Sequence, residues 1–170
     1  MSGEWRVTRG EKEQEIREAS GRSRSPLATR HSPLVIEGYA SLWGVADLNG
    51  DVVQAGAFAD SLAKTGAAGV RMLNQHDARA PVGVWERIEE DARGLFVRGR
   101  IEDWSAEARF AGALSRAGAL DGLSIGYRTA RARRQGRLRV LSGVDLWEVS
   151  LVIETSTRTV RRMHLKRLRP

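Results

Sequence analysis

Apolar and polar positions alternate over most of the chain from Leu34 to Ile153, which is the period-two pattern of half-buried β-strands. β-Branched and aromatic residues gather in the same segments, and polar turns such as 89–94 separate them. The strands follow one another through short connections, so we expect sequential strands to pair as hairpins. The pattern predicts strands over residues 34–43, 52–54, 70–73, 81–88, 95–101, 123–127, 138–141 and 144–153.

Two segments change to helical spacing. A short helix is predicted over 57–64, before Gly66, and a longer one over 104–117, before Gly118. One face of the longer helix carries Trp104, Ala108, Ala111 and Leu114. Helices do not alternate with strands, which argues against a doubly wound parallel sheet. We therefore expect an α+β, mainly β fold: a closed or nearly closed β-barrel of about seven strands wrapped by a few helices.

The chain divides into three parts by composition. Residues 1–33 are charged and then rich in Ser, Arg and Pro, which predicts a flexible N-terminal arm. Residues 34–157 hold the predicted strands and form one domain, and residues 158–170 form a basic C-terminal tail. The sequence shows neither the apolar core of a signal peptide nor an apolar run near the about 20 residues that span a bilayer. We expect a soluble intracellular protein with no membrane contact.

The net charge of +7 comes from two short segments. Residues 128–139 hold six arginines and no acid, and residues 158–170 hold six basic residues and no acid. Outside these segments 16 basic residues face 21 acidic ones. The basic segments predict contact with an acidic protein scaffold or with nucleic acid; the alternative is a solvated hairpin and a solvated tail.

The residue types exclude several kinds of site. There is no cysteine, hence no disulfide, no thiolate metal site and no cysteine nucleophile. The turn 47–51 resembles half of a calcium-binding loop, but the glutamate at the twelfth position is missing. We expect neither a metal nor a cofactor.

Acid–base chemistry near neutral pH points to His76, the one histidine inside the predicted domain. A nucleophile next to such a base is offered by Ser124, which lies on a strand between glycines that leave room for a substrate backbone. The group that orients the imidazole is Glu148, a carboxylate within an apolar strand, because burying it requires a partner. Asp145 and Asp77 stay open as alternatives for this third role, and Glu148 has the alternative of pairing with an arginine from 128–139.

Several segments together resemble the prohead (capsid maturation) serine proteases of tailed bacteriophages and gene transfer agents. They follow one another in the family's order over about residues 36–153. The segments are Glu37–Trp43, Asp51–Phe58, Met72–Asp77, Pro81–Gly83, Gly94–Val97, Gly122–Tyr127 and Leu146–Val152.

The resemblance implies a herpesvirus assembly protease-like fold, with His76 as general base, Ser124 as nucleophile and Glu148 as the third residue. It implies a serine endopeptidase with a Ser-His-Glu type triad. Such an enzyme acts inside the assembling prohead in the bacterial cytoplasm, on the scaffold region of the capsid protein and on itself. The resemblance also leaves open whether the enzyme forms a homo-oligomer. The competing hypothesis is a non-enzymatic, basic capsid-assembly or scaffold-binding protein.

Overall fold

The computed structural model describes residues 34–47, 49–153 and 164–166. The arm predicted over 1–33 lies outside these residues, as does most of the tail predicted over 158–170. No helix in the described ranges has both the length and the apolarity to cross a membrane.

The described strands form one sheet, and a long hairpin lies at one edge of it. The order of neighbours is β2-β7-β3-β4-β5-β1-β8, and β6 pairs along the other edge of β7. β7 runs antiparallel to β6 but parallel to both β2 and β3. The strands are β1 (Leu34–Leu42), β2 (Asp51–Val53), β3 (Arg71–Asn74), β4 (Asp77–Glu90), β5 (Gly94–Ile101), β6 (Gly122–Gln135), β7 (Leu138–Val152) and β8 (His164–Lys166).

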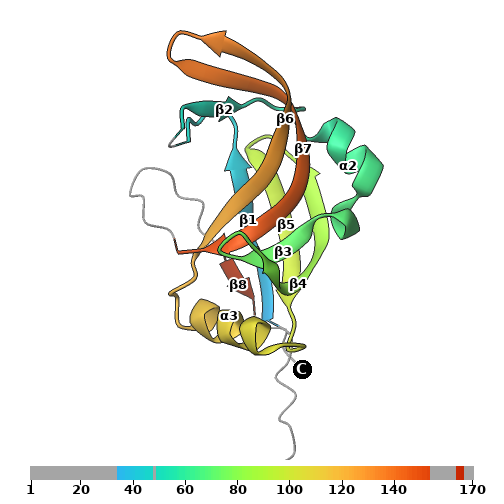
Figure 1. The fold of residues 1–170 in the computed structure, drawn as a ribbon, viewed down its shortest axis with the longest axis vertical. Coiled ribbons are helices and arrows are strands. Elements are labelled where there is room, and N and C mark those ends of the chain that lie inside the picture. The colour runs from blue at the N-terminus through green and yellow to red at the C-terminus, as the bar shows by residue number, and fades with distance from the viewer. Residues whose placement is uncertain (1–33, 48, 154–163, 167–170) are drawn as a thin grey trace, which may run out of the picture. The chain divides into compact units, whose positions relative to one another are not determined.

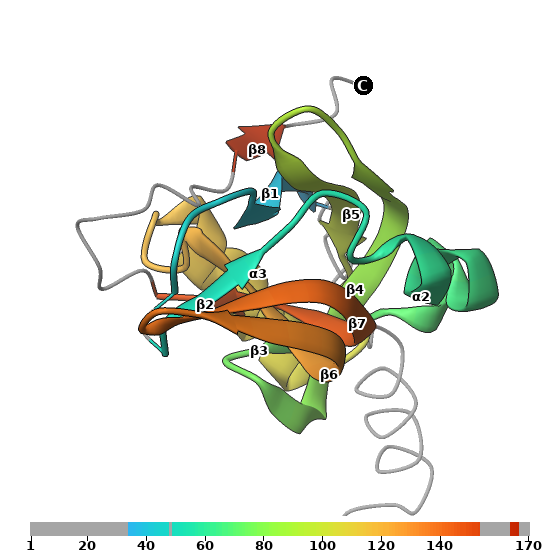
Figure 2. The same ribbon diagram turned by 90° about the horizontal axis from the view of Figure 1, so that it is seen from above.

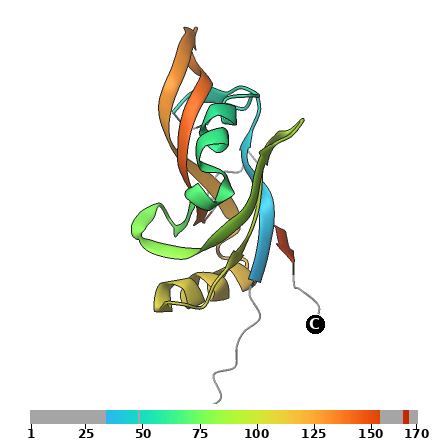
Figure 3. The same ribbon diagram turned by 90° about the vertical axis from the view of Figure 1, so that its right-hand side faces the viewer.

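The sheet curls around its core. Figure 1 shows β6 and β7 rising together, and Figures 2 and 3 show this pair facing the β1–β5–β4 side of the same sheet. β1 approaches β6, but these strands are not paired with each other within the described part of the sheet. The mainly β prediction is therefore confirmed in its nearly closed form. The space inside the curl is filled by fully buried side chains that include Ile36, Phe58, Met72, Leu95, Val97, Leu123 and Leu151.

In the described part of the chain, two α-helices pack against the sheet (Figure 1). α2 (Ala59–Thr65) contacts β7 and β4 and leads into a short 3-10 turn, Ala67–Gly69. α3 (Ala106–Arg116) begins at Ser105, whose side chain accepts a hydrogen bond from the Ala108 N–H at 3.0 Å. The prediction that Trp104 is part of this helix is wrong: Trp104 precedes α3, is 54% exposed and donates its indole N–H to the Pro81 carbonyl.

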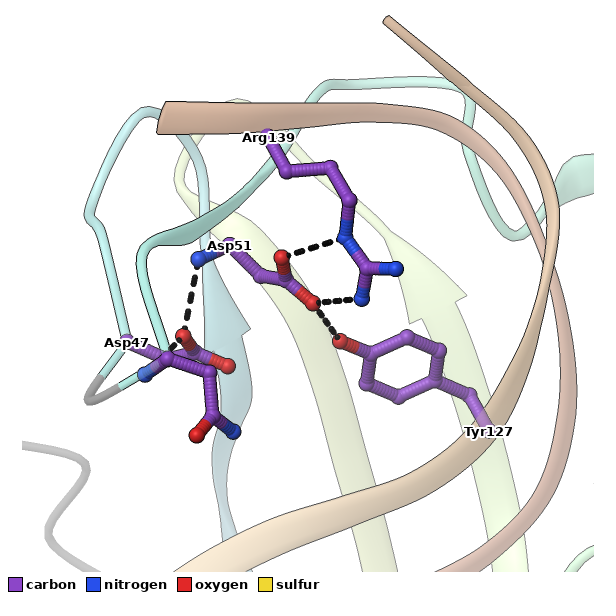
Figure 4. A network of polar contacts seen from close by, with 5 residues as sticks. Asp47, Asp51, Tyr127 and Arg139 are labelled. Carbon is purple, nitrogen blue, oxygen red and sulfur yellow. Dashed lines mark hydrogen bonds and ion pairs between the residues drawn. The ribbon is translucent and has the colours of Figure 1, made fainter. Parts of the chain in front are cut away.

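The long hairpin is joined to β2 by a polar network around Asp51 (Figure 4). Asp51 is buried, and its carboxylate accepts hydrogen bonds from the Tyr127 hydroxyl at 2.8 Å and from Arg139 Nε at 2.7 Å. The Asp51 N–H donates to the Asp47 carboxylate, which closes the turn before β2. The hydrogen bond from Arg139 holds the pKa of Asp51 below its usual value. Burial, together with Asp51, raises the pKa of Tyr127 above its usual value.

Candidate active site

β7 supplies the buried polar half of the site. Successive residues of a strand point to opposite faces, so Val149 and Leu151 enter the core while Glu148 and Ser150 point to the other face. Both polar side chains are nevertheless 0% exposed. A carboxylate and a hydroxyl at this depth require hydrogen-bond partners, because an unpaired buried polar group is destabilising.

These partners come from the turn between β3 and β4. Gln75 and His76 form a two-residue connection, and both adopt positive φ, 51° and 63°. Positive φ at both positions matches the type I′ hairpin turn, which favours Asn and Gly rather than Gln and His. The Gln75 N–H donates to the Leu151 carbonyl at 2.9 Å, so the turn is fixed to β7 by its own backbone.

His76 and the two β7 side chains make a closed ring of hydrogen bonds. His76 Nδ1 lies 2.6 Å from Glu148 Oε1, and the Ser150 hydroxyl donates to Glu148 Oε2 at 2.5 Å. The His76 backbone N–H donates to Ser150 Oγ at 3.1 Å. An ionised carboxylate only accepts hydrogen bonds, so Nδ1 carries the proton and Nε2 is left as the basic nitrogen. The His76 side chain is 44% exposed, which makes the ring accessible to a substrate.

β6 brings Ser124 to the same face. Ser124 pairs directly with Ser150, and Gly126 pairs with Glu148, across the antiparallel β6–β7 ladder. Directly opposite residues share a face, with Cβ atoms about 4.5–5.5 Å apart. Ser124 is thus one cross-strand step from a hydroxyl that contacts His76, and it is partly exposed. Among the contacts of the described residues there is no hydrogen bond from Ser124 to His76, so its role as nucleophile stays a prediction.

Gly126 has a role that the sequence did not indicate. The sequence suggested that the glycines beside Ser124 leave room for a substrate. A Cβ atom on Gly126 would lie 2.0 Å from Glu148 Oε1 and 2.7 Å from Glu148 Cδ. The missing side chain therefore makes room for the Glu148 carboxylate.

The alternative acids are occupied elsewhere. Asp145 accepts from Arg128 Nη2 at 2.9 Å, and Asp77 pairs with Arg79. The Arg79 side chain and backbone hold the pKa of Asp77 below its usual value. Glu148 has no arginine partner within the described residues; its neighbours are His76 and Ser150. The described residues also contain no group of three or more His, Asp or Glu side chains placed to hold a metal ion.

Sequence reasoning missed Ser150 and the turn geometry. Ser150 lies two positions after Glu148, which places the two on one face of a strand, so the period-two pattern contained a signal for it. The positive φ of Gln75 had no signal, because Gln does not favour that conformation. His is enriched at positive φ, but it is not one of the residues that mark a type I′ turn.

Solved structures with a similar fold are viral proteases. The bacteriophage T4 capsid assembly protease matches with a TM-score of 0.58 at 17% identity, over 72% of this chain and 83% of its own. The protease of Kaposi's sarcoma-associated herpesvirus, in complex with a hexapeptide phosphonate inhibitor, matches with a TM-score of 0.52 at 14% identity, over 80% of this chain and 66% of its own. Identities this low show a shared fold. The chain thus has a herpesvirus protease-like fold, and its His76–Glu148 pair joins the β3–β4 turn to β7.

The family is shown by sequence. The family model described as Caudovirus prohead serine protease matches residues 20–161, and the chain belongs to this family. The prohead protease of Enterobacteria phage HK97 is 33% identical over 97 residues, which are 57% of this chain and 43% of that protein. The chain therefore spans less than half the length of this relative.

Proposed function

We propose that this protein is a serine endopeptidase in which His76 is the general base, Ser124 the nucleophile and Glu148 the group that orients the imidazole. The observation that carries the proposal is the 2.6 Å contact between His76 Nδ1 and the fully buried Glu148 carboxylate, on the face of the sheet that Ser124 shares. Burial makes this carboxylate a fixed partner for the ring, because no water competes for it.

The chemistry follows from the tautomer. Nε2 accepts the proton of the Ser124 hydroxyl while Oγ attacks the peptide carbonyl carbon. The tetrahedral intermediate collapses when the imidazolium returns this proton to the leaving amine, and an acyl-enzyme ester forms on Ser124. Water, deprotonated by Nε2, then hydrolyses the ester and restores the serine. Glu148 accepts from Nδ1–H throughout and stabilises the imidazolium.

Ser124 is a better candidate for the nucleophile than Ser150 or Ser142, because it is both accessible to a substrate and close to His76 in the sheet. Ser150 is fully buried, and its hydroxyl already donates to Glu148. Ser142 is exposed on β7 but lies eight residues from Ser150, about 26 Å along a strand.

The test is covalent labelling with a fluorophosphonate, which reacts with activated serines. Wild-type protein should be labelled at Ser124, Ser124→Ala and His76→Ala should lose the label, and Ser142→Ala should keep it. Equal labelling of wild type and Ser124→Ala would refute the assignment. If no serine in the protein is labelled, the non-enzymatic scaffold-binding hypothesis is favoured.

The substrate we propose is the scaffold region of the capsid protein, cleaved inside the assembling prohead in the bacterial cytoplasm, together with self-cleavage. This is supported by the family and by relatives that are a prohead protease and a capsid assembly protease. Co-expression of the capsid protein with the wild type should shorten it, whereas co-expression with Ser124→Ala should not. N-terminal sequencing of the products then identifies the cleaved bonds.

We propose that the turn half of the β6–β7 hairpin, residues 128–139, binds an acidic segment of the substrate or scaffold protein. Of its six arginines, three are paired, Arg128 with Asp145, Arg131 with Asp60 and Arg139 with Asp51. The other three have no ion pair within the described residues: Arg133, Arg134 and Arg137. A groove of about 670 Å³ lies beside them and includes Trp43, Val53, Leu138 and Val140 in its lining. An acidic polypeptide segment with an apolar side chain fits this combination of charge and apolar surface.

Nucleic acid fits less well, because residues 128–139 contain no aromatic side chain on which a base could stack. Reversing the three free charges (Arg133→Glu, Arg134→Glu and Arg137→Glu together) should weaken binding of an acidic scaffold peptide by about tenfold or more at low salt and by less at high salt. Reversal of the already paired Arg128 is the matched control. Tighter binding of a single-stranded oligonucleotide than of the peptide would contradict the choice of a protein partner.

A further inference from the structure

We propose that Ser150 is a positioning residue of the active site: its hydroxyl fixes the Glu148 carboxylate and the His76 backbone at once, and so sets the geometry of the general base. The inference rests on the proposed function for its effect on proteolysis, but the arrangement that it describes can be measured without a substrate.

The two hydrogen bonds of Ser150 act on different parts of the site. Its O–H donates to Glu148 Oε2 at 2.5 Å, while His76 Nδ1 holds Oε1 of the same carboxylate. With both oxygens engaged, the carboxylate plane is fixed. Ser150 Oγ also accepts the His76 N–H at 3.1 Å. His76 is thus held at its backbone and at its ring by one connected set of groups.

The backbone conformation of the turn explains why His76 needs these hydrogen bonds. His76 has φ of 63°, a conformation that is unfavourable for most non-glycine residues. Without an acceptor for its N–H, the His76 backbone is free to relax toward negative φ, which would carry the ring away from Glu148. The Gln75 N–H bond to Leu151 holds the preceding residue but not His76 itself.

A role in nucleophilic attack is excluded for Ser150 by its burial. Its side chain is 0% exposed, and its proton already lies in a short bond to a carboxylate. Its cross-strand partner is Ser124, so a displacement of Ser150 reaches both the nucleophile's strand and the base. Ser150 acts through Glu148 and His76, which are the groups that it contacts.

The experiment compares Ser150→Ala and Ser150→Cys with the wild type. Alanine removes both hydrogen bonds. Cysteine keeps nearly the same volume in a buried site but is a weak donor and a weak acceptor. The chain has no other cysteine, so no disulfide interferes. We expect kcat to fall about 10- to 100-fold in both variants with KM nearly unchanged, the range that a small misplacement of a catalytic group produces.

The matched control is Ser61→Ala. Ser61 is also buried, and its Oγ also accepts a backbone N–H from β7, that of Leu146 at 2.9 Å. It contacts neither His76 nor Glu148, so Ser61→Ala should lower the melting temperature while leaving kcat at the wild-type value.

The second readout is the downfield proton signal of the His76 Nδ1–H in protein labelled with 15N-histidine, assigned by its loss in His76→Gln. It should be present in wild type and Ser61→Ala, and broadened or lost in Ser150→Ala and Ser150→Cys. Retention of both the signal and kcat in the Ser150 variants would overturn the inference. Loss of the signal in a protein that never cleaves peptides would uphold the positioning role and refute the proposed function.

Discussion

At the scale of single residues, the site depends on the charge of one carboxylate. Glu148→Gln keeps the shape but offers an N–H to groups that are themselves donors, His76 Nδ1–H and the Ser150 hydroxyl. We expect kcat to fall by about two to four orders of magnitude with KM little changed. Asp145→Asn is the control, since Asp145 pairs with the exposed Arg128 and should have little effect. A damaging Asp145→Asn with a mild Glu148→Gln would move the third role to Asp145.

The same carboxylate depends on an absent side chain. Gly126→Ala would place a Cβ atom 2.0 Å from Glu148 Oε1, so the carboxylate must leave its position against His76. We expect a loss of about 100-fold in kcat, measured with the peptide substrate. Gly112→Ala is the matched control: its Cβ would meet nothing closer than 3.5 Å within α3, and it should stabilise the helix by about 1 kcal/mol. An active Gly126→Ala would mean that Glu148 has a second productive position.

Much of the site could be predicted from residue types, but its geometry could not. His76, Ser124 and Glu148 were singled out by chemistry and by family resemblance, and the structure places Glu148 against His76. The partner of the second Glu148 oxygen is a serine among 13, and nothing in its type separates it from the others. Only strand register, which depends on the whole sheet, shows that Ser150 lies behind Glu148 and opposite Ser124.

At the scale of elements, the predicted strand boundaries are wrong at two places. One is a glycine that does not end a strand, and the other is a tight turn that lacks the usual turn residues. The sequence pattern predicts a break between two strands at Ser142-Gly143, but β7 runs through these residues. Gly143 pairs with Arg131, and a Cβ there would lie 2.9 Å from the Arg131 side chain, so this glycine admits a crossing side chain. Conversely, the predicted strands 70–73 and 81–88 leave residues 74–80 between them, whereas β3 and β4 are joined by the two-residue turn Gln75-His76. No Asn-Gly marks this turn in the sequence.

That turn provides a prediction about stability. Gln75 is exposed and holds φ of 51°, a region that Asn adopts more readily than Gln. Gln75→Asn should raise the free energy of unfolding by about 0.5–1 kcal/mol, or a few degrees in melting temperature, without changing kcat. Gln54→Asn is the control, since Gln54 is exposed but does not have positive φ. A lower melting temperature for Gln75→Asn alone would show that the Gln75 side chain has a stabilising contact of its own.

At the scale of the whole folded domain, the long hairpin separates two tasks. One end of β7 carries Glu148 and Ser150, and the other carries Arg139, which is joined to β2 through Asp51. Nine residues of extended strand between Glu148 and Arg139 correspond to about 30 Å. We therefore expect the Asp51 network to stabilise the turn end of the hairpin without contributing to catalysis.

The pH dependence of stability tests this expectation. Because the folded-state pKa of Asp51 is lower than its unfolded value, the ionised carboxylate stabilises the fold above about pH 4, and this contribution is lost as the pH falls through the folded pKa. Asp51→Asn should lower the free energy of unfolding by about 1.5–3 kcal/mol at pH 7. The difference in melting temperature between wild type and variant should then shrink below pH 4, where wild-type Asp51 also becomes neutral.

A control variant, Asp145→Asn, and a measurement of kcat test whether Asp51 affects stability without affecting catalysis. Asp145→Asn removes an exposed carboxylate from the same hairpin and should change the melting temperature little at pH 7, since exposed ion pairs contribute only about 0–1 kcal/mol. Asp51→Asn should keep wild-type kcat at pH 7, because His76 and Glu148 belong to the other end of β7. A variant that is destabilised equally at pH 7 and pH 3 would contradict the electrostatic origin of the effect. A fall in kcat would instead show that the turn end of the hairpin is coupled to the active site through β7.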